Sequence, residues 1–296
     1  MSNDKGKTLV FVGAHPDDET FGMGATLAKY VAEGVKVYYI CATRGEAGSV
    51  EPRYLKDYAS IAELRCAELS AAAKELRLAG VYYLNYRDSG MNGSKDNQNP
   101  SALFNAPIEQ VAERIVKIFR ELKPDVVITH DPSGGYNHPD HIATHKATVK
   151  AFYACNDPLQ YPENGMTYQP KKLYYGVRSR RLLKIMIKLM GIFGSNVHKY
   201  GRNHDIDLTK MTEINYPIHA VIKLPKSAME TRIKAAACHA SQGGGRQSSR
   251  GNGVMGFANS VYNLKNRICG YQDSFMREYP VFKGGRKEKD LFEGIK

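Results

Sequence analysis

The sequence predicts an α/β fold of the Rossmann-like kind, in which helices cover both faces of a mainly parallel sheet. Short apolar runs, the first at residues 9–12, have the composition of strands buried on both sides. They alternate with longer segments in which apolar residues recur at helical spacing, and such alternation is typical of right-handed βαβ units. No shift in composition divides the 296 residues, so we expect a single domain spanning residues 1–296.

Each element follows from a local pattern. Helical segments end at glycines, as at Gly34 and Gly80, and two of them begin at a proline, Pro107 or Pro225. The polar stretch 85–106 is predicted to be an irregular loop, and loops of that length are often functional. The expected strands are 9–12, 35–41, 81–84, 125–129, 172–177 and 214–224, and the expected helices are 25–33, 58–78, 107–122, 142–154 and 225–240.

The composition disfavours several classes of protein. Five cysteines lie far apart without a Cys-x-x-Cys pair, which disfavours a disulfide framework and a thiolate zinc site. No apolar run reaches the roughly 18 residues of a membrane span and no signal-peptide pattern opens the chain, so we expect a cytoplasmic protein. The net charge of +12 would suit nucleic acid, an anionic membrane surface or a small anion, and charge alone does not choose among them.

Two segments have an unusual composition. Residues 178–205 are basic, and residues 178–194 interleave Arg and Lys with Leu, Ile and Met. A basic amphipathic helix can lie on a membrane surface, but the same apolar positions suit packing on the fold or on a partner subunit, which is the interpretation we favour. Residues 242–256 are rich in Gly and Ser, so we expect a flexible loop, either disordered or forming a mobile rim of the site.

The residues that could carry chemistry form two packets. Ala14-His15-Pro16-Asp17-Asp18-Glu19 follows the first predicted strand, and Tyr136-Asn137-His138-Pro139-Asp140-His141 follows the predicted strand 125–129. Ligands bind at the carboxyl ends of strands in an open parallel sheet. Helix capping by Asp17, Asp18 or His138 could explain either packet alone. Capping does not explain why two packets of similar composition both follow strands.

Together the packets supply the donors of a Zn²⁺ site. Imidazole and carboxylate groups hold Zn²⁺ in hydrolases, where three protein ligands leave one position for water. The ion lowers the pKa of that water, and a neighbouring carboxylate can take its proton. Attack on an acetamide builds negative charge on oxygen, which the ion, His138 and the Tyr136 hydroxyl could stabilise. The leaving amine needs a proton, which His138 or the protonated Asp17 could donate.

With these packets the chain resembles the PIG-L/LmbE family of zinc-dependent N-acetylglucosaminyl deacetylases. The resemblance spans about residues 8–242 and includes Arg65, Arg87-Asp88-Ser89-Gly90-Met91, Gly134-Gly135-Tyr136 and His239-Ala240-Ser241-Gln242. It implies that His15, Asp18 and His141 bind the metal and that Asp17 is the general base. It also implies that His138 stabilises the oxyanion or protonates the amine, and that Asp140 tunes His138 through a hydrogen bond.

The resemblance further implies that Arg65 and Asp88 line a sugar pocket. Arg65 could instead lie on a solvated helix face beside Glu63 or Glu68, and Asp88 could be an ordinary turn residue. Asn137 stands where the branch of the family closest in motif usually has glycine, which leaves the identity of the substrate open. The remaining histidines fit neither packet: we expect His130, His145, His198, His204 and His219 to be surface or packing residues, and His239 to support the site from behind.

The predicted function is removal of the acetyl group from a small molecule that contains N-acetylglucosamine, by a Zn²⁺-dependent hydrolase. The expected partner is that N-acetylated amino sugar, and a homo-oligomer stays open. A related interpretation is a zinc amidase that acts on a larger acyl conjugate. An interpretation of a different class is a basic protein that binds nucleic acid or membrane, and we expect no nucleic-acid partner.

Overall fold

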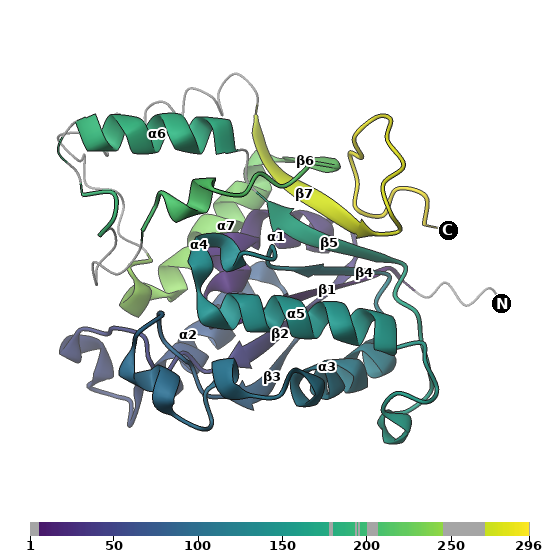
Figure 1. Cartoon of the computed structure of the whole chain (residues 1–296), viewed down its shortest axis with the longest axis horizontal. Helices are drawn as coiled ribbons and strands as arrows, with labels where there is room; N and C mark the ends of the chain where they lie inside the picture. The colour runs from purple at the N-terminus through teal and green to yellow at the C-terminus, as the bar shows by residue number, and fades with distance from the viewer. Residues whose placement is uncertain are drawn as a thin grey trace.

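The computed structural model describes residues 6–177, 180–192, 194, 196–199, 207–244 and 270–295. Within them, seven strands form one sheet of order β3-β2-β1-β4-β5-β7-β6, with helices on both faces (Figure 1). The strands are Thr8–Gly13 (β1), Lys36–Thr43 (β2), Gly80–Tyr86 (β3), Val126–Thr129 (β4), Lys172–Val177 (β5), Ala220–Leu224 (β6) and Tyr271–Tyr279 (β7). The α-helices are Gly24–Ala32 (α1), Ile61–Leu76 (α2), Ile108–Leu122 (α3), Gly134–Asn137 (α4), Pro139–Ala154 (α5), Arg180–Ile192 (α6) and Lys226–Cys238 (α7).

The predicted α/β fold with a mainly parallel sheet is confirmed. β1 pairs in parallel with β2 and β4, β2 with β3, and β4 with β5. β7 differs, because it is antiparallel to both of its neighbours, β5 and β6. The sequence pattern did not predict β7, whose residues are mostly half-buried and among which Phe275 alone is fully buried. Pairing on both edges therefore makes this segment a strand.

β1 shows how the sheet builds a core on each face. Alternate side chains of a strand point to opposite faces. Val10 and Val12 pack in one core with residues of α3 and α5, and Leu9 and Phe11 pack in the other with residues of α1 and α2. Figure 1 shows α3 and α5 on the near face and α1, α2 and α7 behind the sheet. Because both faces are covered, residues 9–12 of β1 are all apolar and do not alternate with polar residues.

The strand order reverses between β1 and β4. The chain places β2 and β3 on one side of β1 and then returns to place β4 on the other side. The loops that follow β1 and β4 therefore diverge at neighbouring strand ends, and such a switch point opens a crevice that binds ligands. Val12 of β1 pairs with Thr129 of β4, so both packets begin at the same edge of the sheet.

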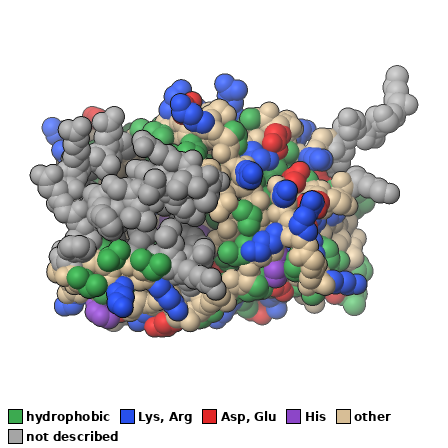
Figure 2. All heavy atoms as spheres, turned by 90° about the horizontal axis from the view of Figure 1, so that it is seen from above, with side chains coloured by type: hydrophobic (Ala, Val, Ile, Leu, Met, Phe, Trp, Pro, Cys, Tyr) green, Lys and Arg blue, Asp and Glu red, His purple; other side chains and the backbone are tan. Residues whose placement is uncertain are grey.

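The basic segment is described only in part. α6 buries Ile187 and Met190 and leaves Ile185 and Ile192 exposed, so part of its apolar surface is covered. On the face shown in Figure 2, the described Lys and Arg side chains are scattered among acidic and apolar ones. Among the described residues we find no helix that could serve as a membrane span. Residues 178–179, 193, 195 and 200–205 of the basic segment and 245–256 of the predicted flexible loop lie outside the described residues.

Candidate active site

The first packet makes a sharp turn at the end of β1. Asp17 has a φ of 137°, which residues other than glycine rarely adopt, and it precedes a π-helical turn, Asp18–Gly22. The Glu19 carboxylate accepts a hydrogen bond from the Asp17 N–H at 2.9 Å, and the Arg65 guanidinium donates to the Pro16 carbonyl at 2.7 Å. The Asp17 side chain makes no capping bond to the turn. The surroundings thus hold a strained backbone that directs two carboxylates into the crevice.

A buried carboxylate orients His15. His15 Nε2 lies 3.1 Å from Asp140 Oδ2, and Asp140 also accepts hydrogen bonds from the N–H and the hydroxyl of Ser89. A proton on Nε2 leaves the lone pair of His15 Nδ1 free for a metal. The predicted hydrogen bond between Asp140 and His138 is made by the Asp140 backbone. The Asp140 carboxylate turns to His15, and only the Asp140 N–H reaches His138, at 3.2 Å from Nδ1.

Donor atoms of the three predicted metal ligands converge. His15 Nδ1 lies 3.2 Å from His141 Nε2, and His141 Nε2 lies 3.4 Å from Asp18 Oδ1. The other oxygen of Asp18, Oδ2, lies 3.9 Å from His15 Nδ1. Tetrahedral Zn²⁺ with ligands at about 2.0–2.1 Å separates them by about 3.3 Å. The spacing and the mixed nitrogen and oxygen donors therefore fit such an ion, whereas the ligand role of each residue stays a prediction.

Other donors lie close to these three. The described residues form three overlapping groups whose ligand atoms lie within 4.8 Å of one another: His15, His138 and His141; His15, Asp88, His138 and Asp140; and Asp18, His130 and His141. His15 and Asp18 thus each share a group with His141, but not with each other. Hydrogen bonds already occupy some of these ligand atoms, because the Asp140 carboxylate bonds His15 Nε2 and His138 Nδ1 accepts the Asp140 N–H. His15 Nδ1 and His141 Nε2 face each other at 3.2 Å and are the imidazole nitrogens available to an ion.

The second packet begins α5. Pro139 occupies the first turn of the helix, and His138 caps it through Nδ1. The prediction that His138 caps this helix is therefore correct, and the capping hydrogen bond also fixes the orientation of its ring. Because Nδ1 accepts a hydrogen bond, the neutral ring carries its proton on Nε2. Burial, and then the charge of His15, lowers the pKa of His138 to about 3, so the ring is neutral near pH 7.

Gly134 allows α4 to approach α5 closely. Its φ is 63°, and a Cβ atom there would lie 3.0 Å from His141 Cβ and 2.9 Å from Ile142 Cγ1. The close approach brings Tyr136 to the site, where its ring centroid lies 5.3 Å from that of His141 and 5.8 Å from that of His138. Burial raises the pKa of Tyr136, so its hydroxyl keeps its proton at neutral pH.

Arg65 and Asp17 form a buried ion pair. Arg65 is 3% exposed, its Nη2 lies 2.8 Å from Asp17 Oδ2, and its Nη1 donates to the Gly45 carbonyl at 3.1 Å. The alternative of a solvated helix face beside Glu63 or Glu68 is therefore wrong. Burial raises the pKa of Asp17 to about 6, against the opposing charge of Arg65. Arg65 thus fixes the predicted base, and its contact with a sugar stays a prediction.

Asp88 lies in the same cluster. Its side chain is buried, and Oδ1 lies 3.6 Å from His15 Nε2 while it accepts the Gly90 N–H at 2.8 Å. Its Oδ2 lies 4.0 Å from Arg65 Nη1. The turn explanation accounts for the bond to Gly90, but the carboxylate also faces the predicted ligand His15.

His239 reaches the site through Glu19. His239 Nε2 lies 2.7 Å from Glu19 Oε1, and both side chains are fully buried. The other oxygen of Glu19 accepts the Asp17 N–H. His239 therefore supports the backbone of the first packet from behind.

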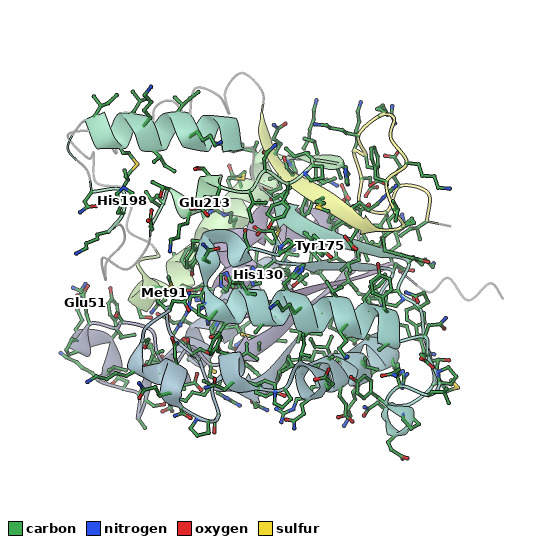
Figure 3. All side chains as sticks on the ribbon, viewed as in Figure 1. Glu51, Met91, His130, Tyr175, His198 and Glu213 are labelled. Carbon is green, nitrogen blue, oxygen red and sulfur yellow. The ribbon has the colours of Figure 1, made fainter. Side chains whose placement is uncertain are left out.

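The sequence pattern places His130 among packing residues, but the structure places it in the site. His130 Nε2 lies 3.3 Å from Asp18 Oδ2, and its ring stacks on that of His141 at 4.0 Å and 8°. Figure 3 labels His130 in the centre of the molecule, beside α5. A signal was available, because His130 directly follows β4, at a strand end where ligands bind. The contact of Ser89 with Asp140 was also not predicted, and here no sequence pattern connects the two residues.

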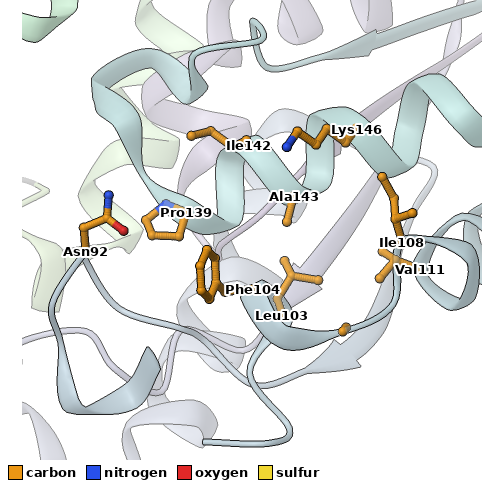
Figure 4. A pocket seen from close by; sticks show the side chains of 10 residues that line it. Asn92, Leu103, Phe104, Ile108, Val111, Pro139, Ile142, Ala143 and Lys146 are labelled. Carbon is orange, nitrogen blue, oxygen red and sulfur yellow. The ribbon is translucent and has the colours of Figure 1, made fainter. Parts of the chain in front are cut away.

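A pocket of about 390 Å³ lies beside α5 but does not include the cluster (Figure 4). Pro139, Ile142, Ala143 and Lys146 line it from one side of α5, and Leu103 and Phe104 are among the residues that line it from the preceding loop. At about 100° per residue, His141 projects from nearly the opposite side of the helix. The pocket and the metal-ligand candidates thus lie on different sides of α5.

A Rossmann-like sheet with a buried histidine and carboxylate cluster at its switch point, and a further carboxylate beside it, fits a metal-dependent hydrolase. The chain belongs to the PIG-L family, whose profile, described as GlcNAc-PI de-N-acetylase, matches residues 10–152. This membership confirms the resemblance and the enzyme class, a deacetylase that hydrolyses an amide bond.

Two relatives are each named 1D-myo-inositol 2-acetamido-2-deoxy-alpha-D-glucopyranoside deacetylase. The protein from Streptomyces scabiei is 32% identical over 98% of this chain and 90% of its own length. The protein from Thermomonospora curvata is 32% identical over 99% of this chain and 98% of its own length. Among solved structures, N,N'-diacetylchitobiose deacetylase from Pyrococcus horikoshii has a TM-score of 0.61 at 20% identity, covering 92% of this chain and 84% of that chain. The likeness to that structure shows the same fold.

Proposed function

We propose that this chain is a Zn²⁺-dependent N-deacetylase that acts on a small molecule containing N-acetylglucosamine. The observation that carries the proposal is the approach of His15 Nδ1 to His141 Nε2 at 3.2 Å, with the Asp18 carboxylate 3.4 Å from His141 Nε2 through Oδ1 and 3.9 Å from His15 Nδ1 through Oδ2. The names of the two relatives specify an inositol-linked N-acetylglucosamine, and both align with nearly the whole chain. We therefore take a glucosaminide of that type as the first substrate to test.

The residues suit Zn²⁺ better than a hard cation, because two of the three proposed ligands are imidazoles. A Zn²⁺ ion held there would polarise the acetamide carbonyl and lower the pKa of the attacking water. Asp140 would make His15 a stronger ligand by holding its Nε2 proton.

Asp17 is the proposed general base. Arg65 engages its Oδ2, which leaves Oδ1 to accept a proton from water as the water oxygen bonds the acetamide carbon. Asp17 then returns this proton to the nitrogen as the C–N bond breaks, and the products are acetate and a free amine. A pKa of about 6 suits a group that takes and returns a proton near neutrality.

His138 is proposed to stabilise negative charge as a neutral donor. Of the two roles that the resemblance implies, this one fits the tautomer, because the proton is on Nε2. A second proton on Nδ1 would face the Asp140 N–H, so the ring is a poor source of a proton for the amine. The Tyr136 hydroxyl would be a second donor from the same side.

Asp88 is the proposed contact to the sugar, since a carboxylate can accept hydrogen bonds from sugar hydroxyls. Arg65 would act on the sugar through the residues it positions, because its Nη atoms already bond Asp17, Pro16 and Gly45.

The test is release of free amine from a panel of N-acetylglucosaminides, with the inositol-linked sugar, diacetylchitobiose and a simple methyl glycoside as members and a larger N-acyl conjugate for comparison. The metal-loaded protein should release amine from at least one N-acetyl substrate, a chelator should abolish release, and Zn²⁺ should restore it. Asp17→Asn protein with full metal content serves as the matched control. No release from any N-acetyl member by metal-loaded protein would refute the proposal.

A further inference from the structure

His130 contacts two of the proposed metal ligands at once. Its Nε2 lies 3.3 Å from Asp18 Oδ2, and its ring stacks on the His141 ring with centroids 4.0 Å apart. The edge of the Phe11 ring packs against it at 6.0 Å, and the backbone carbonyl of His130 accepts a bond from His145 Nδ1 at 2.9 Å. The ring is therefore held from several directions, next to both proposed ligands.

The stacking geometry argues against His130 as a ligand of the same ion as His141. An imidazole binds a metal through a lone pair that lies in the plane of its ring. The planes of His130 and His141 are within 8° of parallel, and the rings lie face to face. Two nearly parallel, separated planes do not share the point at which one ion would sit. His130 therefore acts on the metal site through its contact with Asp18.

Asp18 Oδ2 gathers donors while Oδ1 stays open. Oδ2 accepts hydrogen bonds from the Ala14 N–H at 2.9 Å and the His15 N–H at 3.0 Å. His130 Nε2 is buried, has no hydrogen-bond partner among the described residues, and lies 3.3 Å from the same oxygen. Oδ1 instead lies 3.4 Å from His141 Nε2. The two backbone donors fix the rotation of the carboxylate, and the unpartnered His130 Nε2 beside Oδ2 can reinforce them, so that Oδ1 is the oxygen left for an ion.

We propose that His130 is a positioning residue. It holds Asp18 Oδ2 and so orients Asp18 Oδ1 towards the metal position beside His141 Nε2. The inference rests on the proposed function only in that a metal binds at His15, Asp18 and His141. It predicts that the donor on His130, rather than its aromatic ring, supports metal affinity. Groups that orient ligands typically contribute 10- to 100-fold in metal affinity.

Two substitutions separate the donor from the ring. His130→Phe keeps a ring that can stack on His141 and removes the donor, and His130→Gln keeps an N–H donor and removes the ring. The control is His198→Gln, because His198 is an exposed histidine that pairs with Asp207 at 3.1 Å on the surface. Circular dichroism and thermal unfolding of the metal-free proteins establish that each variant is folded.

The measurement is the affinity of the metal-free, full-length protein for Zn²⁺ alone, by competition with a chromophoric chelator. We expect His130→Phe to bind Zn²⁺ about 10-fold or more weakly, His130→Gln to recover most of that loss, and His198→Gln to match the unaltered protein. The absorption spectrum of bound Co²⁺ should keep its band positions in His130→Phe, because the ligand set is the same.

Three results would overturn the inference. They are unaltered Zn²⁺ affinity in His130→Phe, a His130→Gln affinity no better than that of His130→Phe, and a Co²⁺ spectrum in His130→Phe that indicates the loss of a nitrogen ligand. None of these readouts uses turnover. A chain that binds Zn²⁺ as expected but deacetylates nothing would therefore refute the proposed function and leave this inference intact.

Discussion

Two substitutions at His138 can test whether it acts as a neutral donor. His138→Asn places an amide oxygen near the position of Nδ1, so it can still cap α5, but it places no donor near the position of Nε2. His138→Gln extends an amide nitrogen towards the position of Nε2, and this nitrogen donates a hydrogen bond but cannot give up a proton near pH 7. The pair therefore separates capping, hydrogen-bond donation and acid catalysis.

The expected size of the effect follows from the loss of a single donor. Removing one donor to a developing oxyanion typically costs about 10²–10³ in kcat, or about 3–4 kcal/mol. His138→Asn should lose about that factor while its metal content and stability stay close to those of the unaltered protein, because Nδ1 serves only the helix cap. His138→Gln should recover at least about tenfold of the loss, since it restores part of one such donor.

The assay is kcat for amine release by the metal-loaded proteins between pH 6 and pH 10. The pKa of His138 is about 3, lowered first by burial and then by the charge of His15, so the ring keeps one charge state over this range. No limb of the profile should then depend on His138. The reasoning would be refuted by an alkaline fall in rate that disappears in both variants, together with glutamine no better than asparagine.

Three further predictions concern neighbouring groups. Asp17→Asn should keep bound metal and lose at least about 10²-fold in kcat, because the base is gone, and unchanged turnover at full metal content would contradict that role. Asp140→Asn should weaken Zn²⁺ binding about 10- to 100-fold in chelator competition, because the His15 ring loses its carboxylate, and unaltered affinity would count against this orientation. Burial lowers the pKa of His239, but the contact with Glu19 outweighs it and raises the pKa above its ordinary value near 6.5. The His239–Glu19 pair therefore stabilises the fold fully below pH 6.5, and this stabilisation is lost as the pH rises through the raised pKa of the folded state. Urea unfolding between pH 6 and pH 9 should show a decline that is smaller in His239→Gln, and equal declines would mean that the pair does not contribute.

The parallel half of the fold could be predicted because its strands are buried on both faces. Residues 9–12 and 126–128 are continuously apolar, and that pattern depends on local sequence alone. β7 could not be found in this way, since its residues are mostly half-buried and only its pairing with β5 and β6 makes it a strand. Local pattern likewise put the start of α2 at residue 58, whereas the Ser60 hydroxyl caps the helix so that it begins at Ile61.

The positions of the two packets could be predicted, but the partners of their side chains could not. The packets lie at strand ends, so the switch point brings them together whatever their side chains do. Which carboxylate holds which imidazole depends on rotamers and on residues distant in sequence. Asp140 turns to His15 rather than to its neighbour His138, and Arg65 reaches from α2 to Asp17. Spacing along the chain carries no information about such contacts.

The concentration of charge in the site predicts that metal binding and folding are coupled. Asp18, Asp88 and Asp140 lie close together around His15, and buried carboxylates are costly unless cations offset them. Zn²⁺ at 100 times its Kd should stabilise the folded state by about 2.7 kcal/mol, since the ion binds the folded site and not the unfolded chain. For a chain of this size that corresponds to a rise of about 5–10 °C in the unfolding midpoint of the metal-free protein. Asp18→Asn should remove most of the rise, because it removes a ligand charge. An equal rise in that variant would mean that the stabilising ion binds elsewhere. If Zn²⁺ restores activity but does not raise the midpoint of the unaltered protein, the catalytic ion does not stabilise the fold.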